Sequence, residues 1–205
     1  MIRRAVASML LSLIIPLSTP RAVAADATSA AEKVRLETSE GPIVIRLEMK
    51  RAPITAGNFL RYVDEKRFDG TSFYRAARNR RDPTFGLVQG GINHKAVRAL
   101  IPIAHEPTSR TGLKHGDGTV SMARNAPGTA MGDFFITVGP ASYLDARPGN
   151  IGYAAFGQVV EGMSVVRKIL AGPTHPGGWS KTTMGQSLVT PIRIISARRV
   201  RSPER

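Results

Sequence analysis

The sequence predicts a mainly β protein in which a closed barrel or a sandwich of short strands is capped by two helices. Short runs rich in β-branched and aromatic residues follow one another along the chain, and Gly, Pro, Asn and Asp clusters separate them. Two segments show the helical spacing of apolar residues. Many short strands with two isolated amphipathic helices are typical of a barrel whose ends are covered. The alternating pattern does not distinguish a barrel from a sandwich, or seven strands from eight.

The first predicted elements are a β-hairpin and a helix. Residues 33–49 (KVRLETSEGPIVIRLEM) alternate apolar and polar positions on both sides of Glu40-Gly41, which predicts two strands joined by a turn. A helix is predicted over residues 52–68, because Pro53 suits the first helical turn, where its missing N–H costs no hydrogen bond. The apolar face of this helix consists of Ala56, Phe59, Leu60 and Val63.

Most of the remaining chain predicts strands. The β-prone runs are 71–76 (TSFYRA), 84–89 (TFGLVQ), 101–106 (IPIAHE), 118–123 (GTVSMA), 134–139 (FFITVG) and 153–160 (YAAFGQVV). Residues 162–170 (GMSVVRKIL) predict the second helix, and residues 190–200 (TPIRIISARRV) predict the last strand. With 205 residues and no internal repeat, the chain is expected to form one domain with its own core.

The N-terminal segment predicts export. Arg3 and Arg4 precede an apolar run (AVASMLLSLIIPL), and the small residues AVAAD follow it, a pattern typical of a secretory signal peptide. The run is shorter than the roughly 20 residues that span a bilayer. We therefore predict cleavage after Ala24 or Ala25. The predicted division of the chain is a signal peptide at 1–24, a flexible leader at 25–32, one folded domain at 33–200 and a tail at 201–205.

Charge and cysteine content narrow the possible functions. The net charge is +14, and the signal peptide carries Arg3, Arg4 and Arg21 and no acid, so its removal leaves +11. A basic excess can aid solubility or attract nucleic acid, an anionic membrane surface or acidic envelope polymers, and export disfavours nucleic acid. The absence of cysteine excludes disulfides, thiol catalysis and thiolate metal sites. The four histidines lack the close spacing of a metal site, so no cofactor is predicted.

Six motifs follow one another along the chain: FYR (73–75), LVQGG (87–91), GTVSMAR (118–124), FFITVG (134–139), YLD (143–145) and FGQVVEGMSVV (156–166). Together they resemble the cyclophilin-type peptidyl-prolyl isomerases, from about Lys33 to Val200, and most closely the exported bacterial branch. The resemblance implies an eight-stranded antiparallel β-barrel capped by two α-helices, with a proline-binding groove on its outer face. It also implies a periplasmic monomer that acts on proline-containing polypeptides and assists the folding of exported proteins.

An arginine suits this chemistry. Rotation about a peptide bond has a barrier of roughly 18 to 20 kcal/mol, because the nitrogen lone pair is delocalised into the carbonyl. A fixed positive donor directed at that lone pair or at the displaced oxygen favours the twisted state, and a guanidinium carries several donors and stays charged. By resemblance, Arg75 is the catalytic arginine, and Gln89 orients it and binds substrate. The reaction needs no metal, nucleophile or proton relay.

The same resemblance assigns further residues to the substrate groove. Phe135, Leu144 and Leu87 match the apolar pocket for the proline ring, with Leu87 replacing a methionine of similar volume. Ala123 matches the alanine whose backbone holds the peptide. Phe134 is assigned to the core, since neighbouring residues on a strand point to opposite faces. The remaining candidates are Arg124, where many members have asparagine, Asp133, Tyr143, where cyclosporin-sensitive members have tryptophan, and Tyr153.

Two positions depart from the family pattern. Gly86 replaces the pocket phenylalanine, and Phe85 stands one residue earlier, where a strand turns its side chain to the other face unless a bulge intervenes. Asp133 replaces a glutamine, and a carboxylate beside Arg75 would partly cancel its field. On this hypothesis Asp133→Gln raises activity. A short insertion is expected to form a solvated loop that includes Arg78, Arg80 and Arg81.

Three functions from different classes follow. The first is an active prolyl isomerase, which predicts turnover that Arg75→Ala abolishes. The second, favoured by Gly86 and Asp133, is a module that binds proline peptides with little turnover. The third, favoured by the charge, is an interaction protein that docks on anionic envelope surfaces, which predicts salt-dependent binding that survives Arg75→Ala.

Overall fold

The computed structural model describes residues 32–178 and 180–200, so the predicted signal peptide, the leader up to residue 31 and the predicted tail lie outside the described residues. In this part of the chain the strands are β1 (Lys33–Thr38), β2 (Gly41–Leu47), β3 (Thr71–Arg78), β4 (Gly86–Gly91), β5 (Thr119–Met122), β6 (Asp133–Val138), β7 (Ala155–Glu161), β8 (Thr174–His175) and β9 (Ser187–Arg199). The helices are α1 (Pro53–Asp64), the single turn α2 (Thr108–Thr111) and α3 (Met163–Ala171). Short 3-10 turns occupy Ala96–Arg98 and Ser142–Leu144.

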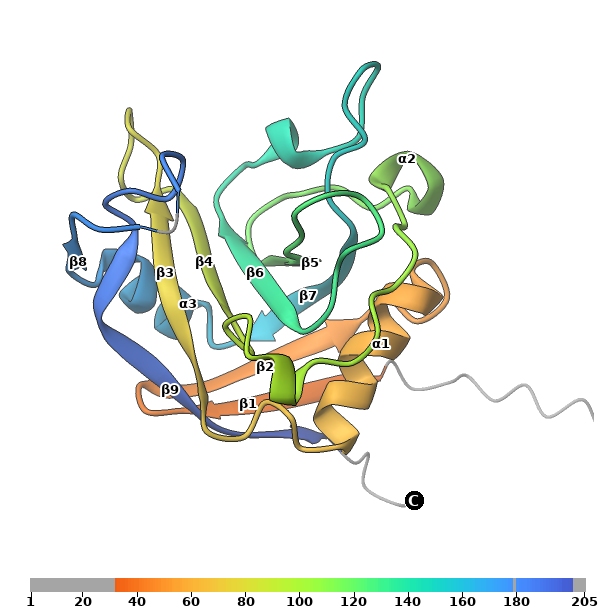
Figure 1. The fold of residues 1–205 in the computed structure, drawn as a ribbon, viewed down its shortest axis with the longest axis horizontal. Coiled ribbons are helices and arrows are strands. Elements are labelled where there is room, and N and C mark those ends of the chain that lie inside the picture. Colours follow the sequence, from red (N-terminus) through yellow and green to blue (C-terminus); the bar gives the residue numbers. More distant parts are fainter. Residues whose placement is uncertain (1–31, 179, 201–205) are drawn as a thin grey trace, which may run out of the picture.

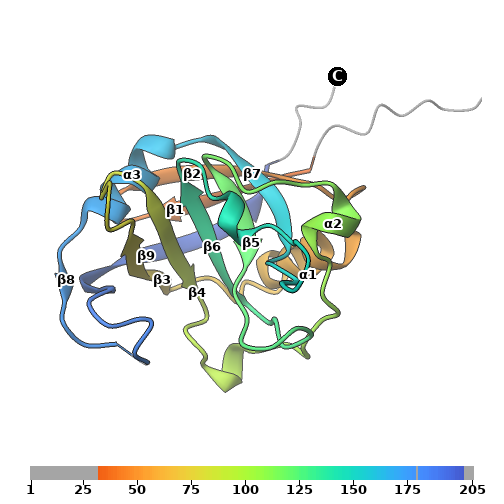
Figure 2. The same cartoon turned by 90° about the horizontal axis from the view of Figure 1, so that it is seen from above.

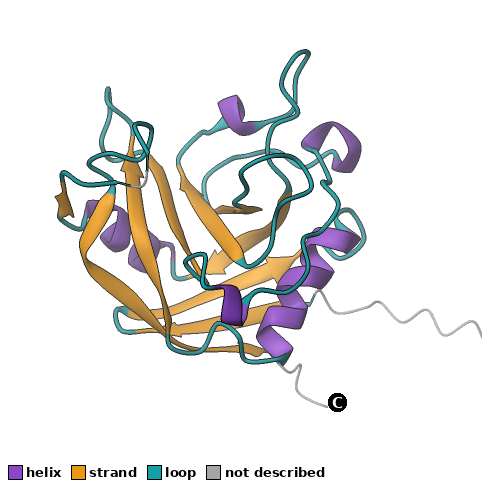
Figure 3. Ribbon diagram, in the orientation of Figure 1, coloured by secondary structure: helices purple, strands orange, loops and turns teal. Residues whose placement is uncertain are grey.

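The sheet closes on itself. Its strands follow the order β1-β2-β7-β5-β6-β4-β3-β9, and β9 pairs back with β1, so eight antiparallel strands complete a ring (Figure 1). The two-residue strand β8 pairs with the start of β9. Figure 3 shows the same view with the strands in orange. The predicted eight-stranded barrel with two main helices is confirmed, and closure excludes the sandwich.

Aromatic side chains fill the barrel beneath α1. The ring of Phe59 lies 5.3 Å from that of Phe134 and 5.1 Å from that of Phe156, between ring centroids. As predicted, α1 begins at Pro53 and buries Ala56, Phe59, Leu60 and Val63. On the opposite side of the barrel α3 buries Val166, Ile169 and Leu170 (Figure 2). Between residues 32 and 200, leaving aside residue 179, no helix is both long enough and apolar enough to cross a membrane.

The strand predicted at residues 101–106 was wrong. In this segment Ile103 forms an isolated bridge with Ala130, and no strand is present among its residues. Alternation identified a β-prone run, but the closed barrel offers it no free edge. The segment instead brings Glu106 to the start of α1, where its buried carboxylate accepts hydrogen bonds from the backbone N–H of Thr55 at 2.7 Å and of Ile54 at 3.3 Å. Glu106 thus satisfies free N–H groups at the helix N-terminus.

The basic loop after β3 is solvated only in part. Arg80 and Arg81 are exposed, as predicted. The prediction was wrong for Arg78, which is half-buried and donates from Nε to the backbone carbonyl of Leu170 at 2.8 Å, and from Nη2 to the carbonyl of Gly172. These carbonyls lie at the C-terminal end of α3, where cations are favourable. Arg78 therefore joins β3 to the end of α3.

Candidate active site

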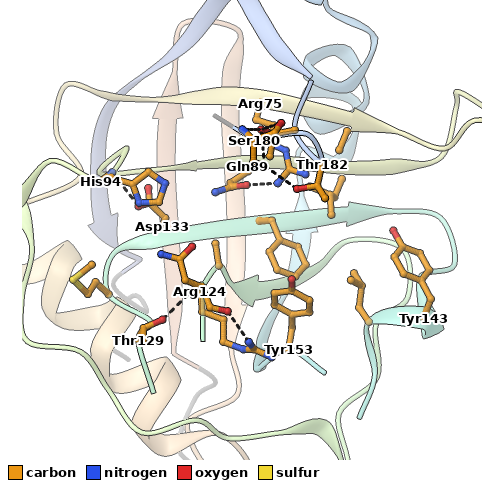
Figure 4. Close-up of a pocket in the computed structure, with 18 of the residues that line it drawn as sticks. Arg75, Gln89, His94, Arg124, Thr129, Asp133, Tyr143, Tyr153, Ser180 and Thr182 are labelled. Carbon is orange, nitrogen blue, oxygen red and sulfur yellow. Dashed lines mark hydrogen bonds and ion pairs between the residues drawn. The ribbon is translucent and has the colours of Figure 1, made fainter. Parts of the chain in front are cut away.

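One groove on the outer face of the barrel, about 670 Å³ in volume, is lined by all ten residues that the sequence analysis assigned to the site (Figure 4). They are Arg75, Leu87, Gln89, Ala123, Arg124, Asp133, Phe135, Tyr143, Leu144 and Tyr153. Ten described residues that it did not assign also line the groove: Ala77, Arg78, Asn79, His94, Asn125, Thr129, Met131, Ser180, Thr182 and Thr183. Most of these lie in loops, whose course local sequence patterns do not reveal.

A β-bulge turns Arg75 toward this groove. Phe73 of β3 pairs with Gly90 of β4, and Arg75 pairs with the next residue of β4, Gln89. One residue of β3 between these two pairs therefore has no partner in β4. Phe73 is fully buried in the core, and strict alternation would send Arg75 to the same face. The extra residue, Tyr74, shifts Arg75 to the outer face. The sequence analysis did not predict this bulge.

Two glutamine side chains hold the guanidinium of Arg75. Its Nη1 donates to Oε1 of Gln89 at 2.6 Å, and its Nε donates to Oε1 of Gln186 at 2.8 Å. Burial lowers the pKa of Arg75, whose side chain nevertheless stays charged because an arginine pKa is so high. Among the described residues no carboxylate lies within 4.0 Å of its nitrogens, and Nη2 makes no hydrogen bond. The arginine is thus fixed, partly desolvated and not neutralised.

The structure does not place Asp133 beside Arg75. Asp133 is 5% exposed and accepts hydrogen bonds from the Tyr74 hydroxyl at 3.0 Å and from the backbone N–H of Asn93 at 2.7 Å. Gln89 connects Arg75 to Tyr74 and so, indirectly, to Asp133, because its Nε2 donates to the Tyr74 hydroxyl at 2.9 Å. Burial and the nearby carboxylate raise the pKa of Tyr74, which therefore stays protonated and donates. The hypothesis that Asp133→Gln raises activity required a carboxylate in contact with Arg75. The structure shows no such contact.

The floor of the groove is a small apolar cluster separate from the barrel core. Phe135, Ala141 and Leu144 are buried together, and Leu87, Ala123 and Tyr153 pack against them. The rings of Phe135 and Tyr153 meet edge to face, with centroids 5.4 Å apart. Phe134 points into the core, as predicted from alternation along β6. The floor has the apolar surface that a proline ring requires.

A buried polar chain supports this floor from below. His115 lies against Phe135 with nearly parallel rings, and its Nδ1 is 2.7 Å from Oδ1 of Asp145. Its Nε2 is 3.0 Å from the hydroxyl of Ser121. Burial lowers the pKa of His115 despite the Asp145 carboxylate, so the imidazole is neutral near pH 7. Because all three side chains are buried, this hydrogen-bonded group holds β5 and the segment around Leu144 in place and does not face substrate.

The backbone at Gly86 excludes a side chain. Its φ is +150°, and a Cβ there would lie 2.1 Å from the carbonyl oxygen of Ala77. Phe85 lies outside the groove, 39% exposed and against Gly139. Phe85 precedes the first residue of β4, and its ring lies away from the groove, so it does not replace the missing pocket phenylalanine. Near Arg75 the hydroxyl groups of Ser180 and Thr182 line the groove (Figure 4).

Gln186, which no sequence motif marked, holds Nε of Arg75, so the expected catalytic role of Arg75 predicts that removing Gln186 weakens turnover. Gln186→Ala frees Nε of Arg75 while leaving the Gln89 contact, so we expect kcat to fall about tenfold, the value of one charge-assisted hydrogen bond. Gln186→Glu keeps an acceptor for Nε but places a carboxylate against the guanidinium, which partly cancels its field, so turnover should fall in this variant too. The matched control is Gln158→Ala, because Gln158 bonds the Asp117 carbonyl away from the groove. Equal losses of kcat in the two alanine variants would contradict this role.

No three His, Asp or Glu side chains of the described residues gather closely enough to hold a metal ion.

Comparisons with known proteins identify the family and agree with the fold. The family described as cyclophilin type peptidyl-prolyl cis-trans isomerase/CLD matches residues 33–198. A peptidyl-prolyl cis-trans isomerase of Acinetobacter baylyi is 38% identical over 167 residues, which cover 80% of this chain and 82% of the relative. Peptidyl-prolyl cis-trans isomerase B of Escherichia coli is 36% identical over 172 residues, covering 80% of this chain and 99% of the relative.

A solved structure shares the fold. The cyclophilin type peptidyl-prolyl cis-trans isomerase of Cryptosporidium parvum superposes with a TM-score of 0.65 at 22% identity, covering 85% of this chain and 100% of that one. A second structure from the same organism, in the presence of the dipeptide Ala-Pro, gives a TM-score of 0.64 at 21% identity, with 83% of this chain and 99% of that one covered.

Proposed function

This chain belongs to the cyclophilin-type peptidyl-prolyl cis-trans isomerases, and from that membership we propose that Arg75 accelerates X-Pro bond rotation in exported proteins. The observation that carries the role of Arg75 is its environment: two glutamines hold a partly buried guanidinium that no carboxylate among the described residues neutralises. A preorganised charge of this kind stabilises a transition state without further rearrangement.

The proposed mechanism needs no covalent step. The proline ring enters the apolar floor at Phe135 and Leu144 and is held still, while the carbonyl before it rotates. As the bond twists, its resonance is lost, and the lone pair returns to the proline nitrogen. Arg75 donates to the electron-rich atoms of the twisted bond, through Nη2 or a neighbouring N–H, and so lowers the barrier. Gln89 keeps the donor in place.

Proline-containing polypeptides are the substrates that this groove fits. The Cryptosporidium parvum protein was studied in the presence of Ala-Pro, which supports the same ligand class here. A binding module with little turnover is the second candidate, because Gly86 leaves the groove without an aromatic ring at that position.

NMR exchange spectroscopy on a neutral Xaa-Pro peptide distinguishes these two candidates. We expect the mature chain to accelerate cis/trans exchange at catalytic concentrations. Shifts of the protein's groove resonances without acceleration would support the binding module and contradict the isomerase mechanism.

Export is part of the proposal and rests on the sequence of residues 1–24. Expression of the full chain in a Gram-negative host should yield a periplasmic protein whose mass corresponds to cleavage after Ala24 or Ala25. Full-length protein in the cytoplasmic fraction would contradict export. Docking on anionic envelope surfaces and the monomeric state stay predictions, to be measured by salt-dependent vesicle binding and by sedimentation.

A further inference from the structure

Arg124 lies in the groove on the far side of β6 from Arg75 (Figure 4). It directly follows Ala123 at the end of β5, and its guanidinium carbon lies 4.8 Å from the centre of the Tyr153 ring. Its Nη1 donates to the backbone carbonyl of Asn125 at 3.0 Å, and its Nη2 donates to the carbonyl of Gly152. The aromatic face and the two carbonyls hold the planar group in one orientation.

The charge of Arg124 is not neutralised by the described part of the chain. No carboxylate there lies within 4.0 Å of its nitrogens, and its Nε is buried without a hydrogen-bond partner. The groove-lining residues include one carboxylate, that of Asp133, whose oxygens bond Tyr74 and the backbone N–H groups of Asn93 and His94. The floor of the groove therefore lies between two arginines without an available anion.

This arrangement matches an anionic side chain on the substrate. A guanidinium has five N–H donors, and the two carbonyls account for two of those of Arg124, so others remain for a carboxylate. The site is half-buried and beside an apolar floor, where a charge pair is screened less than in bulk water. An acidic residue close to the proline in sequence would reach Arg124 while the proline occupies the floor.

We propose, building on the function proposed above, that Arg124 selects substrates carrying an Asp or Glu within two residues of the isomerised proline. Arg124 would then determine specificity, in contrast to Arg75, which acts on the rotating bond. Clients of this enzyme would be acidic or locally acidic segments of exported polypeptides, which the basic charge of the chain also attracts at longer range.

A peptide series tests the proposal. Each peptide has one proline and carries Glu or Gln at one of the two positions before it or the two after it, and both turnover and Kd are measured by NMR at low and high salt. For at least one position we expect the wild type to prefer Glu about fivefold to tenfold at low salt, and less at high salt. Arg124→Gln should remove the preference. Arg124→Glu should instead favour a peptide with Lys at the same position over the Gln and Glu peptides.

The matched control is Arg193→Gln, which removes one exposed charge on β9, outside the groove. It should keep the Glu preference. A wild-type ratio near one at all four positions, or a preference that persists in Arg124→Gln, would overturn the proposal. The Gln peptides separate the two proposals: if they bind without turnover, the isomerase mechanism fails, while the Kd ratios still decide the role of Arg124.

Discussion

Arg75→Ala should lower kcat for an X-Pro peptide by about a hundredfold or more, the effect of removing one preorganised donor from a transition state. The loss should appear mainly in kcat, because the guanidinium interacts more strongly with the twisted bond than with the planar one. The barrel should persist, since the guanidinium bonds the side chains of Gln89 and Gln186 rather than any backbone group of the described residues. Exchange spectroscopy and circular dichroism measure the two effects separately.

Two further variants interpret this result. Arg75→Lys keeps the charge but cannot hold both glutamines with a planar fork, so an intermediate loss of about tenfold is expected. Arg81→Ala removes an exposed arginine of the loop after β3 and should leave turnover unchanged. An Arg75→Ala protein that is folded and retains half of the wild-type kcat would exclude Arg75 as the donor.

Phe134→Ala should destabilise the protein by about 3 to 5 kcal/mol, the range for deleting a buried phenylalanine ring. Phe134 is fully buried, and its ring packs 5.3 Å from that of Phe59 and 5.5 Å from that of Phe68, between centroids. Phe135→Ala, one residue later, should cost less stability, because it belongs to the small outer cluster. It should instead raise the Kd for proline peptides and lower turnover, because it removes the floor of the groove.

Urea unfolding of both variants measures the difference, with peptide titration as the second readout. If Phe134→Ala does not fold, Phe134→Leu should still lower the midpoint while leaving the peptide Kd close to the wild-type value. Equal losses of stability at the two positions, or a greater loss of peptide affinity at Phe134, would contradict the assignment of these rings to opposite faces of β6.

The elements that local pattern determines were predicted well. The hairpin of β1 and β2 follows from alternation around a turn, and α1 follows from Pro53 and one apolar face. Residues 101–106 show the limit of this reasoning, because alternation identifies a strand-forming run but not whether a partner strand has a free edge. This segment forms no strand because the barrel is closed and because Glu106 bonds the first turn of α1.

The candidate site also has features that the sequence predicted and features that depend on tertiary contacts. Motifs that resemble the family identified ten of the residues that line the groove, and the two-residue period of a strand predicted the face that Phe134 and Phe135 each occupy. The contacts that hold Arg75 depend on pairing between distant segments, which no local pattern predicts. The bulge at Tyr74 depends on the pairing of β3 with β4, and Gln186 lies 111 residues along the chain from its partner. Such contacts form only when the barrel closes, because side-chain hydrogen bonds between distant segments leave no period in the sequence.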